Sequence, residues 1–489
     1  MSTATPYIRS ILSDVETPVS LYHKLSQDEP TAFLLESTEG DSRLARYSIL
    51  GVSPAKTVLF SNGQATLHHV TENRTETRPF SNPLSLLQEL LQQYQQSLGI
   101  SATPGKSFPG TAELPFSGGW VGYLGYGATR YFDGIVPQQA APIDVPEGFY
   151  GLYDSVILFD HLYRRITFIS HRPEAEAQAL WEVYRNRMQA AVALPPLSVT
   201  NTTVGDDALF ATVDGPFNKA RFCQAVSQCK QYIEQGQVFQ IVLAQRFSRP
   251  VQGTPLTMYR LLQAVNPSPY AYLLQGPGFS YLGSSPETFV RCQQGRVFLR
   301  ALAGTRRRGR SESEDQALEA ELLKNEKELA EHRMLVDLGR NDLGRVCEVG
   351  SIRVGKVATL TRYTHVMHLG TDIEGQLRSD KSCFEVFQSC FPRGTVTGAP
   401  KIRAMELLSS LEPEQRGIYS GVVGYFDFLG NMDGAIAIRS AVIKDGMAHV
   451  NAGAGVVYDS IPEQEYQETQ NKARSVLTAI YLAEEATQA

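Results

Sequence analysis

The sequence contains no apolar run that approaches the ~18 residues needed to cross a membrane. Its first residues also lack the basic segment and following apolar segment of a secretory signal. The 6 cysteines are scattered without CxxC spacing, so we expect buried free thiols in a reducing compartment. HExxH and EF-hand patterns are absent as well, which argues against zinc and structural calcium. These absences predict a soluble, cytoplasmic protein.

Blocks of positive charge are scarce too. The net charge is −6, and the densest basic run, Arg306–Arg308, is typical of a solvated loop. This balance argues against a nucleic-acid-binding protein. With 489 residues, of which 42% are hydrophobic, the chain can bury a large core or form two to three lobes.

A polar stretch punctuated by Pro, Gly and Asn divides the chain. We predict an N-terminal lobe over residues 1–193, a linker over 194–214 and a second domain over 215–489. Strands are expected at 155–160, 165–170, 238–245, 354–360 and 435–443, and helices near 174–191, 217–235, 315–338, 399–410 and 463–485. Because the strands come in runs, the pattern favours an α+β fold with large antiparallel sheets.

Acidic residues share one face of the last predicted helix. At about 100° per residue, Glu465, Glu468 and Lys472 fall within roughly 60° of one another. Val476 and Ala479 continue the same stripe, so the carboxylates sit at the edge of a face that becomes apolar. An ordinary amphipathic helix with an i,i+4 ion pair would explain this spacing as well.

A second acidic pair shows the same arrangement. Glu328 and Glu331 share a helix face with Leu335 and Leu338. If the two pairs converge, four carboxylates with no histidine or cysteine on the same helix stripes suit a hard cation, and Mg²⁺ is preferred where water and a substrate oxygen complete the shell. Chance pairing on amphipathic helices is the alternative.

Two glycines precede the acidic helix. Gly453 and Gly455 flank Ala454, and we predict a turn whose backbone N–H groups approach an anion near the positive end of the following helix. A simple strand-to-helix turn that needs positive φ accounts for the glycines equally well.

Several further stretches, taken in order, resemble the chorismate-binding enzymes, and within them the large subunit, component I, of anthranilate synthase. These are Leu34–Ser37, Asn266–Tyr270, Ala303–Arg306, Asp337–Leu343, Val366–Leu369, Gly394–Lys401 and the Gly453 segment with its acidic helix. The resemblance covers most of residues 20–485. It implies two large packed β-sheets with helices outside, an active site in the cleft between them, and a catalytic domain over residues 215–489. It also implies that the lobe over residues 1–193 contributes to a regulatory site.

The resemblance also implies a set of site residues. Glu331 and Glu468 would bind Mg²⁺, with Glu328 and Glu465 supporting them. The catalytic group would be the acid Glu287, the imidazole of His368, which is otherwise a satisfied core histidine, and Thr395. The residues that would contact chorismate are Gly304, Thr305, Tyr419, Arg439 on an alternating strand, Gly453, Ala454, Gly455 and Lys472.

Two positions separate the chemistries of the family. Relatives that add water carry a lysine where this chain has Gln240, and relatives that form 4-amino-4-deoxychorismate carry a nucleophilic lysine where it has Ala303. The resemblance therefore implies direct amination of chorismate by ammonia to aminodeoxyisochorismate, then loss of pyruvate to give anthranilate, the first step of tryptophan biosynthesis. The alternatives are aminodeoxychorismate synthase component I, of the folate pathway, and a catalytically inactive tryptophan sensor.

The sequence lacks a Gly-x-Cys-x-Gly-x-Gln nucleophile turn. Ammonia would therefore come from a separate glutamine amidotransferase subunit, component II, in a heterodimer or heterotetramer. Free ammonium is expected to replace that subunit.

A feedback site for tryptophan is implied by Glu36, Ser37, Pro269, Tyr270 and Ala271. Without the resemblance, residues 266–270 would simply predict a rigid Pro-rich turn. Ala271 departs from the bulkier residue usual in the family. Arg393 and Ala301–Leu302 also depart from the family pattern, without removing a functional group.

Overall fold

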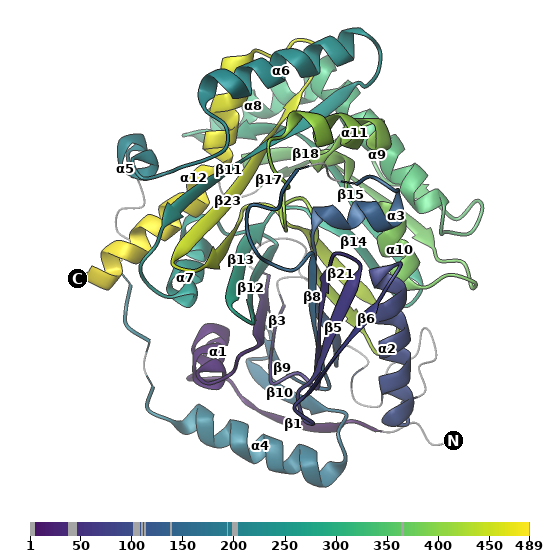
Figure 1. Cartoon of the computed structure of the whole chain (residues 1–489), viewed down its shortest axis with the longest axis vertical. Helices are drawn as coiled ribbons and strands as arrows, with labels where there is room; N and C mark the ends of the chain where they lie inside the picture. The colour runs from purple at the N-terminus through teal and green to yellow at the C-terminus, as the bar shows by residue number, and fades with distance from the viewer. Residues whose placement is uncertain are drawn as a thin grey trace.

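Two large antiparallel sheets form the centre of the molecule. The computed structural model describes residues 5–37, 46–100, 108, 111, 114–136, 139–192, 194–197, 204–362 and 366–488. Within these residues one sheet has 11 strands and the other has 12. Helices cover their outer faces, as Figure 1 shows. The predicted α+β architecture of two packed sheets with helices outside is confirmed.

The first sheet combines both halves of the chain. Its strands, in spatial order, are β1 (Tyr7–Leu12), β10 (Arg165–Ser170), β9 (Ser155–Asp160), β3 (Tyr47–Val52), β2 (Ala32–Glu36), β12 (Tyr270–Gly276), β13 (Phe279–Ser285), β22 (Ser440–Lys444), β23 (Met447–Val456), β11 (Gln240–Pro250) and β19 (Gly398–Ala399).

The second sheet also combines strands from both halves of the chain. Its order is β16 (Arg353–Val354), β18 (Val366–Gln376), β15 (Arg296–Arg307), β14 (Thr288–Gln293), β21 (Met432–Ile436), β20 (Val422–Asp427), β7 (Gly119–Leu124), β8 (Gly148–Tyr153), β4 (Lys56–Ser61), β5 (Gln64–His69) and β6 (Arg74–Pro79), with β17 (Thr359–Arg362) beside β18. The division of the chain near residue 194 stays a prediction, and strands from both sides of it share each sheet.

Both faces of the central strands are covered, so these strands are apolar without interruption. In β8 and β9 every residue is buried. One face of the first sheet packs against the second sheet through a core that includes Phe33, Tyr123 and Tyr281. Helices cover the opposite faces, and a strand buried on both sides therefore loses the alternation of a half-exposed strand.

The helices divide between the two outer faces. The first sheet is covered by α1 (Pro18–Ser26), α4 (Glu174–Gln189), α5 (Asp206–Phe210), α6 (Lys219–Glu234), α7 (Pro255–Val265), α11 (Lys401–Leu411) and α12 (Pro462–Gln488). The second is covered by α2 (Pro83–Ser97), α8 (Glu312–Lys324), α9 (Glu326–Gly344) and α10 (Cys383–Cys390), with the short α3 (Thr129–Phe132) beside it. Among the described helices, none is both long and apolar enough to cross a membrane.

Three predicted elements are divided in the structure. The helix expected over 315–338 is interrupted at Asn325, whose side chain accepts the Glu328 N–H and so caps α9. The strand expected over 435–443 is two strands in different sheets, β21 and β22. The strand expected over 354–360 is replaced by the end of β16 and the start of β17. In each case the apolar spacing continues across an interruption of the helix or strand, and only capping or tertiary packing reveals that interruption.

The cysteine prediction is confirmed. All 6 cysteines are free, and every one except the half-buried Cys223 is buried.

Candidate active site

A cavity of ≈ 560 Å³ lies where the two sheets meet. Strands β11 and β23 of the first sheet and β15 and β18 of the second line it, together with α9 and α12. It brings together most of the predicted site residues, namely Glu287, Gly304, Glu328, Glu331, His368, Thr395, Tyr419, Arg439, Gly453, Gly455, Glu465, Glu468 and Lys472. Residues from positions 287 to 472 therefore share one surface.

Two predicted site residues are placed differently. Ala454 is completely buried on the face of β23 opposite to Gly453 and Gly455, because successive strand residues point to opposite sides. Its methyl group therefore faces away from the cavity. The Thr305 backbone pairs with His368 across β15 and β18, but its side chain lies outside the described part of the structure.

The predicted glycine turn is wrong. Gly453 and Gly455 lie inside β23, paired with β11 in extended conformation. A Cβ atom on Gly453 would lie 3.0 Å from the Tyr419 hydroxyl, and one on Gly455 would lie 2.9 Å from Gln240 Nε2. The glycines are therefore needed for close approach of side chains from neighbouring elements, and not for positive φ.

The acidic helix begins within one residue of its predicted start. Helix α12 begins at Pro462, while the Ser460 hydroxyl accepts a hydrogen bond from the Val457 N–H at 3.0 Å. The Ser460 side chain therefore bonds across the turn that precedes the helix. The predicted stripe is confirmed, since Val476 and Ala479 are buried about one and two turns beyond Lys472.

Three of the four carboxylates that α9 and α12 place in the cavity have a polar partner. Gln240 Nε2 donates to Glu331 Oε1 at 2.7 Å, and Arg306 pairs with Glu328 at 2.9 Å. Across the cavity Lys472 Nζ lies 2.5 Å from Glu468 Oε1 and donates to the Gly453 carbonyl at 2.9 Å. Neutral or cationic donors thus hold both carboxylates of α9 and Glu468 of α12.

These carboxylates also act on one another. Burial raises the pKa of Glu331, and the nearby charges of Glu328 and Glu468 raise it further. Burial likewise raises the pKa of Glu465, with Glu468 adding to the effect. Within the described residues no three Asp, Glu, His or Cys side chains already form a metal-binding group. Two mutually repelling carboxylates from facing helices still fit Mg²⁺, which takes few protein ligands and keeps several waters.

Glu287 lies at the wall of the same cavity. It follows β13, the residue is 8% exposed, and Thr395 Oγ1 donates to its Oε1 at 2.9 Å. Burial raises the pKa of Glu287, and the charge of Arg393 and the Thr395 hydrogen bond oppose that rise. A carboxyl group that keeps its proton to higher pH is suited to act as a general acid.

His368 projects from β18 into the cavity. Its Nδ1 lies 3.2 Å from the Gly304 carbonyl oxygen, which can only accept, so Nδ1 carries the proton and Nε2 is the basic nitrogen. Burial lowers the pKa of His368, and the nearby Arg439 lowers it further. The imidazole is therefore neutral near pH 7 and can accept a proton.

Arg439 does not lie on the alternating strand that the sequence predicts. It stands between β21 and β22 with φ of 52°, where the chain passes from one sheet to the other. Its guanidinium donates no hydrogen bond to any described residue, although it lines the cavity. Burial lowers the pKa of Arg439, while Tyr419, Glu468 and Glu287 oppose that shift. A cation without a bonded acceptor in a cavity is suited to binding an anion.

Sequence reasoning missed two cationic residues that line the cavity, Lys327 and Arg306. We expected Arg306 on a solvated loop, yet it lies at the end of β15, lines the cavity and bridges Glu321 and Glu328. The signal was available in its place directly after the Ala303–Thr305 segment, but the two following arginines obscured it.

Comparison with known proteins identifies the family. Residues 30–478 match the family described as chorismate binding enzyme. The chain belongs to the chorismate-binding enzyme family.

Individual relatives of this chorismate-binding enzyme carry a more specific name. Anthranilate synthase component 1 from Acetivibrio thermocellus is 39% identical over 485 residues, which are 97% of this chain and 95% of that protein. The protein of the same name from Aquifex aeolicus is 40% identical over 491 residues, covering 98% and 95%. The crystal structure of anthranilate synthase component I from Streptococcus pneumoniae TIGR4 matches with a TM-score of 0.77 at 33% identity, covering 96% of this chain and 99% of that one.

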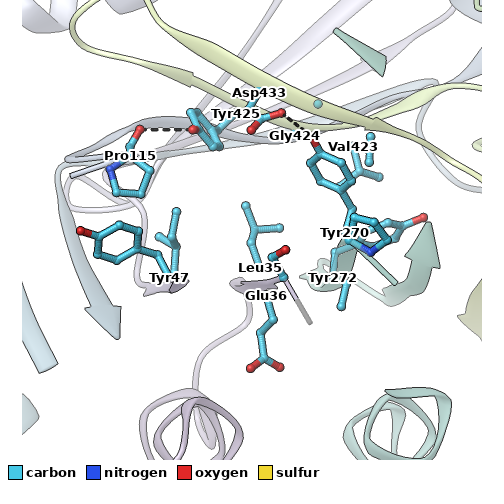
Figure 2. Close-up of a pocket in the computed structure, with 16 residues that line it drawn as sticks. Leu35, Glu36, Tyr47, Pro115, Tyr270, Tyr272, Val423, Gly424, Tyr425 and Asp433 are labelled. Carbon is cyan, nitrogen blue, oxygen red and sulfur yellow. Dashed lines mark hydrogen bonds between the residues drawn. The ribbon is translucent and has the colours of Figure 1, made fainter. Parts of the chain in front are cut away.

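This chorismate-binding enzyme contains a second, separate cavity. It measures ≈ 90 Å³ and lies between β2, β3 and β12 of the first sheet and β20 and β21 of the second. Figure 2 shows Leu35, Tyr270, Tyr272 and Tyr425 around it. All of the residues predicted for a tryptophan site border this cavity, namely Glu36, Ser37, Pro269, Tyr270 and Ala271.

Not all of these residues direct a side chain into the second cavity. In Figure 2 the Glu36 carboxylate points away from β20 and β21, and it accepts a hydrogen bond from the Tyr259 hydroxyl at 2.6 Å. Ala271 pairs directly with Glu36 and packs into the core beneath the first sheet. Because directly paired residues share a face, the small Ala271 side chain leaves the shape of this cavity unchanged.

Asp433 is a polar group in the second cavity that the sequence did not reveal. It lies on β21 and accepts a hydrogen bond from the Tyr270 hydroxyl at 3.0 Å (Figure 2). Burial raises the pKa of Asp433 to about 6, although the charge of Arg291 opposes the rise. The cavity thus joins aromatic walls to one carboxylate, which is ionised above pH 6.

Proposed function

We propose that this chain is component 1 of an anthranilate synthase, and that it converts chorismate and ammonia into anthranilate and pyruvate. Two kinds of support agree. Its relatives bear that name over nearly their whole length, and the cavity contains an acid, a neutral imidazole and a set of cations suited to a dicarboxylate.

The observation that carries the choice of chemistry is the pair Gln240 and Ala303. Both line the cavity. The Gln240 side-chain amide already donates a hydrogen bond to Glu331, and an amide cannot deprotonate water. Alanine offers no nucleophile. A cavity with neither a lysine base nor a lysine nucleophile at these places favours direct attack by ammonia on C2 over the aminodeoxychorismate alternative.

The chain's own groups divide the reaction into two steps. In the first, Glu287 donates its proton to the departing C4 hydroxyl while ammonia bonds to C2, which yields aminodeoxyisochorismate and water. In the second, His368 Nε2 accepts the C2 proton, the enolpyruvyl group leaves as pyruvate, and the ring becomes aromatic. Each role requires the protonation state that burial favours for that residue.

The remaining groups would hold the substrate. Arg439 would bind the enolpyruvyl carboxylate, and Lys472 would balance the charge of the dianion. Glu331 and Glu468 would hold Mg²⁺, with Glu328 and Glu465 supporting them through water. A bound Mg²⁺ would polarise the ring carboxylate and stabilise negative charge that develops there.

The source of ammonia is a partner subunit in this proposal. The name component 1 implies a second component, and no cysteine of this chain is surface-exposed and activated as a glutaminase nucleophile requires. We therefore propose a separate glutamine amidotransferase subunit.

The first prediction tests the reaction directly. Purified protein mixed with chorismate, Mg²⁺ and ammonium is expected to produce anthranilate, measured by its fluorescence, without a partner. Omitting ammonium or chelating the metal is expected to abolish the signal. Loss of chorismate with formation of 4-amino-4-deoxychorismate would instead identify the alternative chemistry. Binding of tryptophan without any loss of chorismate would support the sensor alternative.

Tryptophan is the proposed inhibitor, and the second cavity is its proposed site. The aromatic walls suit an indole ring, and Asp433 offers a carboxylate to the ammonium group. The cavity lies between the same two packed sheets as the active site. A ligand that changes the spacing of the sheets can therefore act on both places.

The second prediction concerns Asp433→Asn. Loss of the charge is expected to raise the tryptophan concentration for half-inhibition by about tenfold or more, because hydrogen bonds to charged groups contribute roughly 1.5–3 kcal/mol. Since the Asp433 pKa is raised to about 6, inhibition of the wild type should weaken as the pH falls through 6. Asp427→Asn is a matched control, because Asp427 is also buried, with a pKa raised to about 6, but lies outside this cavity. Unchanged inhibition in Asp433→Asn would place tryptophan elsewhere.

A further inference from the structure

Arg393 is a buried cation with few partners. Its side chain is 4% exposed, and its Nε atom is buried without a hydrogen-bond acceptor. Among the described residues its one acidic neighbour is Asp342, with Nη1 and Oδ2 separated by 3.9 Å. Asp342 already accepts hydrogen bonds from Lys401 Nζ at 3.0 and 3.2 Å. The Arg393 guanidinium is therefore poorly compensated, and burying such a charge is costly.

The backbone holds Arg393 in place beside the active site. Its carbonyl oxygen accepts from the Val396 N–H at 3.2 Å and from the Thr397 hydroxyl at 2.9 Å. Two residues further on, Thr395 donates to Glu287. Arg393 itself does not border the cavity, whereas Thr395 and Glu287 do. Arg393 thus belongs to the segment that forms the wall beside the proposed acid, while its side chain lies outside the cavity.

We propose that Arg393 is a positioning residue that controls the protonation of Glu287 from behind the cavity wall. The inference rests on the proposed function of Glu287 as the acid of the first step. Without a cation behind it, a carboxyl group at this degree of burial would hold its proton too firmly to release it to a leaving hydroxyl. A poorly compensated guanidinium outside the cavity supplies the opposing field without competing for substrate.

The other groups around Glu287 support this assignment. Burial raises its pKa, and the opposing influences are, in decreasing order, Arg393, the Thr395 hydrogen bond, Lys472 of α12 and Arg439 between β21 and β22. Lys472 is engaged with Glu468 and Gly453, and Arg439 is proposed to bind substrate. Arg393 is the cation whose field on Glu287 persists whether or not substrate is bound.

The experiment compares pH profiles of kcat/KM for chorismate in the whole protein, at a constant concentration of free ammonia. The variant Arg393→Met removes the charge and keeps the length of the side chain. It should move the basic limb of the profile to higher pH by about one unit, because loss of a nearby cation raises the pKa of a buried acid. A shift of under about 0.2 unit would overturn the proposal.

Two further variants separate this role from packing. Asp342→Asn removes the anion that screens Arg393 and keeps an acceptor for Lys401, so it should move the limb in the opposite direction. It also decides the question if Arg393→Met fails to fold, and an unmoved limb would then overturn the proposal. Lys401→Met removes the other cation on Asp342, and the limb should move by much less than in Arg393→Met. An equal shift in Lys401→Met would show that any disturbance of this network has the same effect, which would also overturn the proposal.

The outcome is distinguishable from failure of the proposed function. If the wild type forms no anthranilate, the function itself fails, whatever Arg393 does. If the wild type forms anthranilate and the limb of Arg393→Met is unmoved, only the assignment of Arg393 fails.

Discussion

Glu468→Gln is expected to lose about a thousandfold or more in Mg²⁺-dependent turnover while the fold is retained. A metal that polarises the reacting carboxylate contributes several kcal/mol, and about 1.4 kcal/mol corresponds to tenfold in rate. The amide keeps the shape of the side chain but removes one of the two charges that would hold Mg²⁺ against Glu331. Steady-state rates over a range of Mg²⁺ concentrations, with titration calorimetry of Mg²⁺ in the presence of chorismate, measure both losses.

Glu463→Gln is the matched control for this prediction. Glu463 lies on the same helix, in the first turn of α12, but is exposed and does not border the cavity. It should leave turnover and Mg²⁺ affinity unchanged. Full activity of Glu468→Gln at limiting Mg²⁺ would contradict the metal assignment. Loss of Mg²⁺ affinity without loss of turnover would mean that the ion is structural.

The acidic pairs could be predicted from the sequence because helix geometry alone aligns them. Residues three apart on a helix share a face, so Glu328 with Glu331, and Glu465 with Glu468, were each placed together by spacing. That the two pairs line one cavity depends on the docking of α9 and α12 against different sheets. Such long-range packing leaves no periodic signal, and only the resemblance suggested it.

The local geometry of the site was harder to predict. The sequence does not distinguish a glycine within a strand from a glycine in a turn. A turn is predicted at Gly453 because a helix follows. The position requires glycine because a Cβ atom would lie too close to the hydroxyl of Tyr419, a residue outside β23. Arg439 likewise continues an alternating pattern, although the chain changes sheets at that residue. An alternating apolar pattern predicts that one face of a strand is buried, but it does not predict to which sheet the strand belongs.

The second cavity shows the same limit. Glu36 and Ala271 border it, yet strand alternation turns both side chains to the other face of the first sheet. A motif locates the strands that form a wall, but the residue that supplies the charge, Asp433, comes from a strand more than 150 positions away in the sequence.

His368→Asn is expected to separate the two steps of the reaction. The asparagine amide can still donate to the Gly304 carbonyl, as Nδ1 does now, but the basic Nε2 is lost. Loss of a positioned base costs roughly 10²–10⁴-fold, and only the second step needs this base. Chorismate consumption should therefore fall by less than about tenfold, while anthranilate formation falls by about a thousandfold. Absorbance of chorismate, anthranilate fluorescence and mass spectrometry of the accumulating aminodeoxyisochorismate distinguish the two rates.

His332→Asn is the matched control, because His332 is also buried with a lowered pKa but bonds Thr371 outside the cavity. It should keep the two rates equal. Since burial lowers the pKa of His368, its neutral form persists below the pH at which a free imidazole is protonated. The second step should therefore weaken only as the pH falls through this lowered value, whereas the first step should weaken as the pH rises through the raised value of Glu287. If His368→Asn slowed both steps equally, the imidazole would serve the shape of the cavity and the proton would leave C2 by another route.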